Sequence, residues 1–154
     1  MIAEGRIVFA VVTIAGVLAQ PQTIPPVGAD WFGTWRLNVA KSTYSTEPPY
    51  KGGARRIAPS DNGMLIVDDL VRRRGGILHL EWTGKLDGLD YPVQGVEIVL
   101  TNAYRRVDDR TWDLVQKIDG EVVATARLAM SADGRTIATV TSGNTGHAST
   151  IHEK

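Results

Sequence analysis

The chain has 154 residues, of which 17 are Lys or Arg and 17 are Asp or Glu, so its formal net charge is zero. Sequence-independent binding to nucleic acid or to an anionic membrane depends on a concentrated positive field, and this balance argues against a nucleic-acid partner. The chain contains no cysteine, which excludes disulfides, thiolate metal sites, cysteine nucleophiles and a lipid anchor on an N-terminal cysteine.

The N-terminal residues have the pattern of a secretory signal peptide. The apolar run 7–19 follows a short segment that contains Arg6, and it is shorter than a membrane span requires. The small residues Val17 and Ala19 predict cleavage after Ala19, so that 1–19 is the signal peptide. We therefore expect an exported protein, periplasmic or secreted, with no stable membrane anchor after cleavage. The alternative is an uncleaved anchor.

Residues 20–29 are predicted to form a disordered leader. This segment contains Pro21, Pro25 and Pro26 and shows no periodicity of apolar residues. The remainder, 30–154, has the length of one domain.

The domain repeats one theme, a run of five to ten residues bounded by a turn signal, which is typical of antiparallel strands. The first strand, 32–39, alternates apolar Trp35, Leu37 and Val39 with polar residues. The segment 41–53, which contains two prolines, is expected to be a long loop. Further strands are expected at 54–58, 64–71, 77–86, 96–107, 111–118, 121–130, 135–142 and 149–154.

Turn signals separate these strands. Asp119-Gly120 is the strongest of them, because both central positions of the favoured hairpin turn need a positive φ. The other turns are expected at 60–63, 72–76, 87–95, 108–110 and 133–134.

This pattern predicts an all-β fold, an antiparallel up-and-down β-barrel of eight or nine strands. Closing the sheet removes its two exposed edges, and the order of consecutive hairpins favours a barrel over a sandwich. The interior of a barrel of this size holds either packed side chains or one small ligand.

The opening strand resembles that of a known superfamily. The sequence Phe-Gly-Thr-Trp-Arg-Leu at 32–37 is similar to the Gly-x-Trp start of lipocalins and fatty-acid-binding proteins. The resemblance implies a lipocalin-like barrel whose closed end is plugged by Trp35. The second and third lipocalin signatures are absent, and Arg127 is the candidate for the arginine that stacks on this tryptophan in the family.

A longer likeness covers nearly the whole exported part. The segments 32–42, 87–93 and 131–142 resemble a bacterial group of exported lipocalin-like (calycin-type) proteins of undefined function. These motifs are structural, so they imply a fold rather than a chemistry.

Three aromatic strand residues are the candidate ligand contacts: Trp82, Tyr104 and Trp112. An open barrel mouth lined by aromatic and aliphatic side chains is typical of a ligand pocket, and packing in a filled core is the alternative for each of the three. In 77–86, the side chains of Leu78, Leu80, Trp82 and Leu86 share one face, and His79, Glu81, Thr83 and Lys85 share the other.

No motif for a metal, a cofactor or catalysis is present in the sequence. The three histidines, His79, His147 and His152, lack ligand spacing, and the last two lie near the C-terminus, where we expect frayed polar residues. The carboxylates Asp61, Asp87, Asp108, Asp119 and Asp133 lie in predicted turns, whose geometry they suit. The cluster at 72–74, three arginines, is interpreted as a solvated turn or as a contact for an anionic head group at the barrel rim.

Three functions remain open on the sequence. The first is a binding module that holds a small apolar or amphipathic ligand in the barrel. The second is an interaction or inhibitor protein with a filled core, which would use the loop 41–53 with Tyr44 and Tyr50. The third is a barrel enzyme, an isomerase or hydrolase, in which His79, Glu81 or Tyr104 faces inward.

Overall fold

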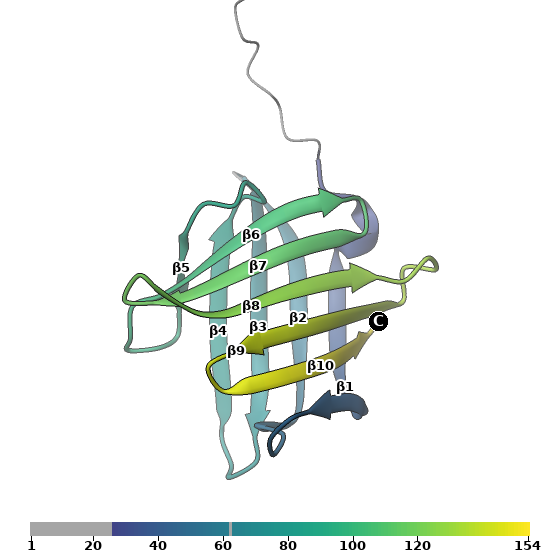
Figure 1. The fold of residues 1–154 in the computed structure, drawn as a ribbon. Coiled ribbons are helices and arrows are strands. Elements are labelled where there is room, and N and C mark those ends of the chain that lie inside the picture. Colours follow the sequence, from purple (N-terminus) through teal and green to yellow (C-terminus); the bar gives the residue numbers. More distant parts are fainter. Residues whose placement is uncertain (1–25, 62) are drawn as a thin grey trace, which may run out of the picture.

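The computed structural model describes residues 26–61 and 63–154 and shows a closed antiparallel β-barrel (Figure 1). One short 3₁₀ helix, η1 (Ala29–Trp31), precedes the strands. The strands are β1 (Gly33–Tyr44), β2 (Tyr50–Ser60), β3 (Gly63–Arg72), β4 (Ile77–Gly84), β5 (Tyr91–Gln94), β6 (Leu100–Asp108), β7 (Thr111–Ile118), β8 (Glu121–Met130), β9 (Thr136–Gly143) and β10 (Gly146–Glu153). The prediction of an all-β, up-and-down, lipocalin-like barrel is confirmed, with ten strands in place of eight or nine.

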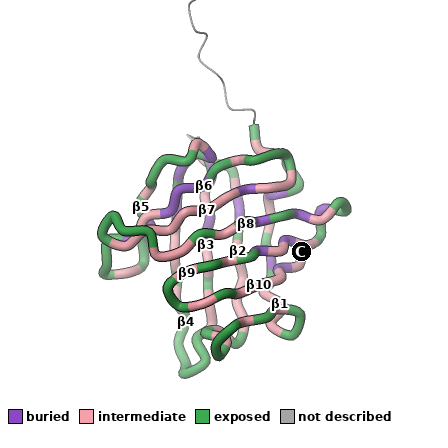
Figure 2. The backbone as a smooth tube through the Cα atoms, viewed as in Figure 1, coloured by how far each residue is buried: buried purple, intermediate pink, exposed green. Residues whose placement is uncertain are grey.

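Each strand pairs with its neighbours in sequence, and the last strand closes the barrel against the first. Leu37 of β1 is the register partner of His152 of β10, which is in turn the partner of Ile137 of β9. Because side chains alternate across a strand, this register sends alternate residues into the interior. Figure 2 shows the buried residues distributed over many strands rather than gathered on one element.

The extra strand lies where one turn and one long strand were expected. The predicted turn 87–95 contains β5, and the predicted strand 96–107 begins only at Leu100. Gly95 has φ +100°, and a Cβ at this position would collide with the carbonyl oxygen of His79, so the chain turns here where only glycine fits. A strand of four residues that contains a proline carries too little periodicity to be recognised in the sequence.

The predicted loop 41–53 is wrong over most of its length, because β1 continues to Tyr44 and β2 begins at Tyr50. The register of β1 against β10 shifts between Asn38 and Thr43, which interrupts the alternation on which the prediction depended. In β2, a Cβ on Gly53 would lie 2.8 Å from the carbonyl oxygen of Asp69, so glycine allows β2 and β3 to pack closely.

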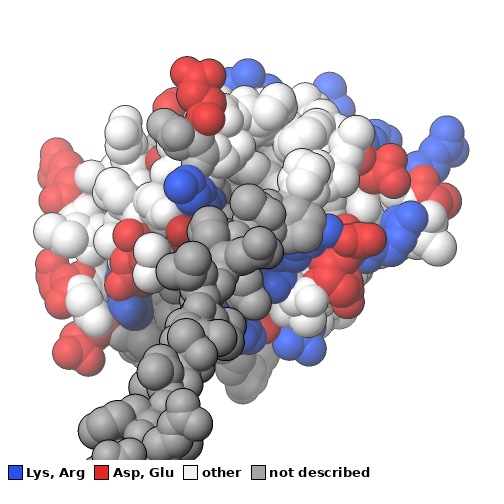
Figure 3. Space-filling view, turned by 90° about the horizontal axis from the view of Figure 1, so that it is seen from above, with Lys and Arg blue, Asp and Glu red and all other residues white. Residues whose placement is uncertain are grey.

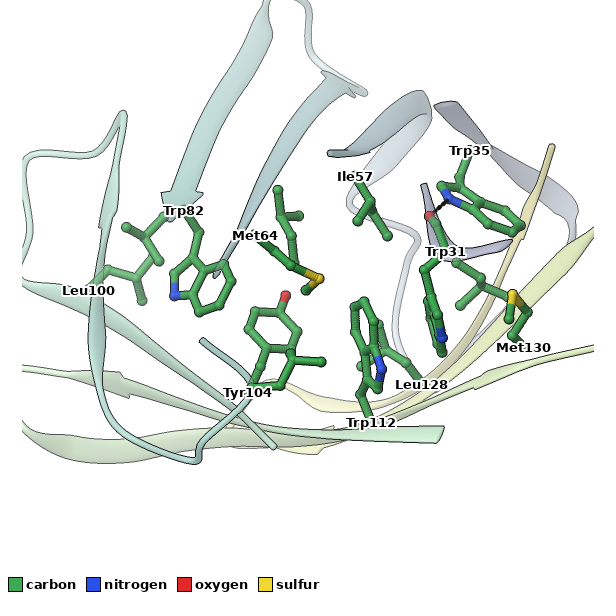
Figure 4. Close-up of a cluster of buried hydrophobic side chains, with 14 residues drawn as sticks. Trp31, Trp35, Ile57, Met64, Trp82, Leu100, Tyr104, Trp112, Leu128 and Met130 are labelled. Carbon is green, nitrogen blue, oxygen red and sulfur yellow. Dashed lines mark hydrogen bonds between the residues drawn. The ribbon is translucent and has the colours of Figure 1, made fainter. Parts of the chain in front are cut away.

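One end of the barrel is closed by a layer of tryptophans (Figure 4). Trp31 and Trp35 are fully buried, and the Trp31 ring stacks on Trp112 with 3.7 Å between the ring centroids. Their indole N–H groups are satisfied, since Trp31 donates to the carbonyl of Asp109 and Trp35 donates to the carbonyl of Trp31, at 2.8 and 2.9 Å. Trp35 therefore lies at the closed end, as the resemblance implied, and Trp31 packs beside it.

The cation over Trp35 is a lysine and not the expected arginine. The Nζ atom of Lys154 lies 4.7 Å from the centroid of the Trp35 ring and donates a hydrogen bond to the carbonyl of Asp30. Arg127 lies elsewhere and forms an ion pair with Asp113. The family resemblance implied an arginine at this place and did not predict that Lys154, the last residue of the sequence, would supply the cation.

The N-terminal predictions fall mostly outside the described residues. The signal peptide 1–19 and most of the leader 20–29 are not described, whereas Val27, within the leader range, packs against the core. Among the described residues, no helix has both the length and the apolar character that a membrane crossing needs.

Candidate ligand-binding cavity

The barrel interior above the tryptophan layer contains a cavity of about 270 Å³. Ligand pockets in proteins typically have volumes of about 300–1,000 Å³, so this cavity suits a small molecule. Its walls are formed by inward-facing residues of β2 to β10, and they differ in character from one side of the barrel to the other.

The wall formed by β3, β4 and β5 is apolar apart from Asp68 of β3. Its side chains are Ile66, Leu70, Leu80, Trp82 and Val93. Register explains this grouping, since Ile66 of β3 pairs with Trp82 of β4, which pairs with Val93 of β5. This wall offers van der Waals contact to a hydrocarbon part of a ligand.

The wall formed by β9 and β10 is polar. Thr139 and Thr141 of β9 alternate with outward-facing residues, and Thr150 and His152 of β10 lie beside them. Threonine suits a strand because of its branched Cβ, and on an inner face it places hydroxyl groups in the cavity.

An ion pair joins β2 to β3 inside the barrel. Arg55 and Asp68 are register partners, and the guanidinium donates two hydrogen bonds to the carboxylate, at 2.7 and 2.9 Å. Each side chain is only 15% exposed. Burial opposes the charge on Arg55, but the attraction of Asp68 and Tyr104 outweighs it and raises the pKa of Arg55. Such a bidentate pair has fixed geometry, and Nη1 of Arg55 makes no hydrogen bond within the described residues.

Tyr104 and two amide side chains extend the polar lining across the cavity. The Tyr104 side chain is 1% exposed, and burial raises the pKa of its hydroxyl, although Arg55 acts in the opposite direction. Gln116 donates a hydrogen bond to the side-chain oxygen of Asn102 at 3.1 Å, and the indole of Trp82 donates to the Asn102 carbonyl. The contact between the two side chains fixes the orientation of both amide groups, whereas the indole of Trp82 binds the backbone carbonyl.

Within the described part of the chain, two polar atoms of the cavity-lining residues are buried without a hydrogen-bond partner: the hydroxyl of Thr139 and Nδ1 of His152. The residues are 8% and 7% exposed. Burial and the positive charge of Arg55 lower the pKa of His152 to about 4, so the imidazole is neutral at neutral pH. A buried polar group without a partner costs about 1–3 kcal/mol, so these two atoms make the empty barrel less stable.

The three predicted ligand contacts are divided between the two regions. Trp82 and Tyr104 line the cavity, with 4.7 Å between their ring centroids, and ligand contact by them stays a prediction. Trp112 lies in the closed-end layer, stacked on Trp31, and is not among the cavity-lining residues. Figure 4 shows Trp112 beside Trp31, with Tyr104 between Trp112 and Trp82.

The structure also places the residues considered for catalysis and metal binding. His79 is exposed and lies within hydrogen-bond distance of Asp69, and Glu81 lies on the same outer face of β4, so only Tyr104 of the three faces inward. His152 is not a frayed terminal residue as expected, because β10 continues to Glu153. No group of three potential ligands gathers to bind a metal within the described part of the chain.

Sequence reasoning missed Arg55, Asp68, Thr139 and His152 as cavity residues. The alternation of Ile66, Asp68 and Leu70 in β3 would have put Asp68 on the apolar face, and a carboxylate on such a face needs a partner. Only the register between β2 and β3 identifies this partner as Arg55. A polar residue within an apolar alternation was therefore the signal available in the sequence.

The three arginines at 72–74 lie at the end of β3 and in the exposed turn that follows it, a position that both interpretations allow. They line an open groove with Glu47, Pro48, Pro49 and Tyr50, and Arg73 forms an ion pair with Glu47 at 3.0 Å. Tyr50 also lines the interior cavity. Figure 3 shows acidic and basic side chains interspersed over the visible surface seen from above Figure 1.

Comparison with known proteins supports the fold. No family model matches the sequence, and no curated protein matches it. Among solved structures, the chain is similar to a point mutant of the fluorescent protein UnaG, a calycin-type β-barrel, with a TM-score of 0.56 and 14% sequence identity. The match covers 81% of this chain and 96% of that one. At this identity the likeness establishes the barrel fold alone.

Proposed function

We propose that this protein binds a small amphipathic molecule in the barrel cavity. The observation that carries the proposal is a 270 Å³ interior cavity with an apolar wall on one side and unpartnered polar atoms on the other. A purely structural core would fill this space, because protein interiors are packed as densely as organic crystals. The fold is compatible, since barrels of this size hold one small ligand.

The groups inside the cavity favour binding over catalysis. Tyr104 has a raised pKa, His152 is neutral and buried, and Asp68 is held by Arg55. This arrangement leaves no carboxylate free to act as a base beside a nucleophile. The same groups supply directed hydrogen bonds to a bound molecule.

Export is part of the proposal and rests on the signal-like segment 1–19. In the exported state the protein would carry or sequester its ligand outside the cytoplasm. N-terminal sequencing of the protein expressed from its full reading frame tests this part, and a chain that retains residues 1–19 would contradict it.

The binding proposal is tested by native mass spectrometry of the protein purified gently from its own cells. We expect extra mass that is lost on denaturation and that corresponds to a small organic molecule. The matched control is the Ala126→Trp variant, in which a bulky side chain replaces a small one in the cavity lining. Bare protein in both samples, under conditions that preserve a known lipocalin complex, would refute the proposal.

A further inference from the structure

The cavity combines one paired charge with several uncharged hydrogen-bonding groups. Of the described residues that line it, only Arg55 and Asp68 carry full charges, and they neutralise each other through two hydrogen bonds. An ionised ligand group in this space would bring an uncompensated charge into a buried site, which is costly. An uncharged polar group avoids that cost.

The unpartnered atoms mark where such a group would bind. His152 is the register partner of Leu37 in β1 and of Ile137 in β9, while Thr139 pairs with Leu128 of β8. Ile137 is 1% exposed and Leu128 is 0% exposed, so both polar residues lie next to the closed-end core and deep in the barrel.

The chemistry of the two atoms also constrains the ligand. A neutral imidazole has one donor nitrogen and one acceptor nitrogen, and a threonine hydroxyl both donates and accepts. Arg55 is close enough that its charge disfavours protonation of His152, and its Nη1 is a further free donor. A group that both donates and accepts, such as a primary amide, satisfies this set better than a group that only accepts.

We propose that the ligand enters with its polar end first and places an uncharged donor–acceptor group, of the amide or hydroxyl class, against Thr139 and His152 beside the Arg55–Asp68 pair. Its hydrocarbon part then lies along Leu80 and Leu70 toward the mouth. This inference rests on the proposed function and specifies the ligand class of the same cavity.

The test uses three probes with the same eight-carbon chain: octanamide, octanoate and octylammonium. Binding to the mature protein is measured by isothermal titration calorimetry at pH 7.5, where the last two are ionised. We expect octanamide to bind at least about tenfold more tightly than either ion, which corresponds to about 1.4 kcal/mol. Preferential binding of either ion would overturn the inference and leave the proposed function intact, whereas no binding by any probe would contradict both.

The location of the amide is tested on the unaltered chain by ¹⁵N NMR of the imidazoles. Octanamide should shift the ring nitrogens of His152 and leave those of the exposed His79 and His147 unchanged. Binding that does not move the His152 signals would overturn the polar-end-first orientation. This measurement does not depend on the folding of any variant.

Thr139→Val removes the unpartnered hydroxyl at nearly constant shape. We expect it to weaken octanamide binding by about twofold to tenfold, the range that one hydrogen bond contributes. The matched control is Thr136→Val on the outer face of the same strand, which should bind octanamide as the unaltered chain does. Equal affinities for the two variants would contradict the assignment of Thr139.

Discussion

The closed end and the cavity half of this barrel differ in how densely their side chains pack and in whether their buried polar groups are hydrogen-bonded. At the closed end, Trp31, Trp35 and Trp112 are buried, and the rings of Trp31 and Trp112 stack. The indole N–H groups of Trp31 and Trp35 donate hydrogen bonds at normal distances. Above this layer, Thr139 and His152 are buried without partners, and the side chains leave a void. The same ten strands support both halves.

This difference indicates which half maintains the fold and which half is available for a ligand. Dense apolar packing stabilises the closed end by removing large rings from water. The cavity half holds unsatisfied groups that make the empty protein less stable and that a bound molecule would satisfy. Four changes test this division, and they are given in order of decreasing expected effect.

Trp112→Ala should be the most damaging change. It removes a ring that stacks on Trp31 in the dense layer, and we expect the free energy of unfolding to fall by about 3–5 kcal/mol. Leu80→Ala, in the apolar wall of the cavity, should cost less than about 2 kcal/mol, since this side chain already faces a void. Urea unfolding followed by circular dichroism measures both. Equal losses in the free energy of unfolding would show that the two halves do not differ in packing.

Asp68→Asn should destabilise the protein by about 3 kcal/mol, because it leaves the charge of Arg55 buried and unpaired. The double variant Arg55→Leu with Asp68→Leu should recover most of this loss, since replacing both members of a buried pair by apolar groups is often neutral. The same urea series measures the two variants. A double variant as unstable as Asp68→Asn would show that the pair itself holds the barrel together.

Stability should fall between pH 6.5 and pH 4 because of His152. Burial lowers its pKa to about 4 in the folded protein, from the ordinary histidine value of 6.5. In this window the unfolded chain binds a proton that the folded chain does not, so stability is complete above pH 6.5 and is lost as the pH falls. The loss amounts to about 3 kcal/mol at most, at 1.36 kcal/mol per pKa unit.

Thermal unfolding across this pH range measures the effect of His152. The His152→Gln variant should lose most of the slope, and the exposed control His147→Gln should keep it. A slope of equal size in both variants would assign the pH dependence to other groups.

Thr139→Val should have the smallest effect and the opposite sign. Removing a buried hydroxyl that has no partner is expected to raise the free energy of unfolding of the empty protein by about 1 kcal/mol. The outer-face variant Thr136→Val should stay within about 0.5 kcal/mol of the unaltered chain. Differential scanning calorimetry compares the two. Destabilisation by Thr139→Val would mean that the hydroxyl is satisfied in solution.

The sequence predicted the barrel, most of its strands and two cavity residues, because these follow from local alternation and turn chemistry. Trp82 and Tyr104 lie on apolar faces of strands that the period-two pattern identifies directly. The strand β5 was missed because a short strand with a proline carries little periodicity, and the continuations of β1 and β2 into 41–53 were missed because register shifts interrupt the alternation. Trp112 has the same local pattern as Trp82, so no local signal separates a closed-end residue from a cavity residue.

The sequence by itself therefore determined the fold class, the positions of the tight turns and the alternation that gives each strand an apolar face. Only the tertiary structure decided which apolar faces pack at the closed end and which line a cavity. It also decided which polar side chains meet inside that cavity. The physical reason is that alternation is a property of neighbouring residues along one strand. Pairing between Arg55 and Asp68, and the burial of His152 beside Thr139, depend on register between strands and on closure of the barrel.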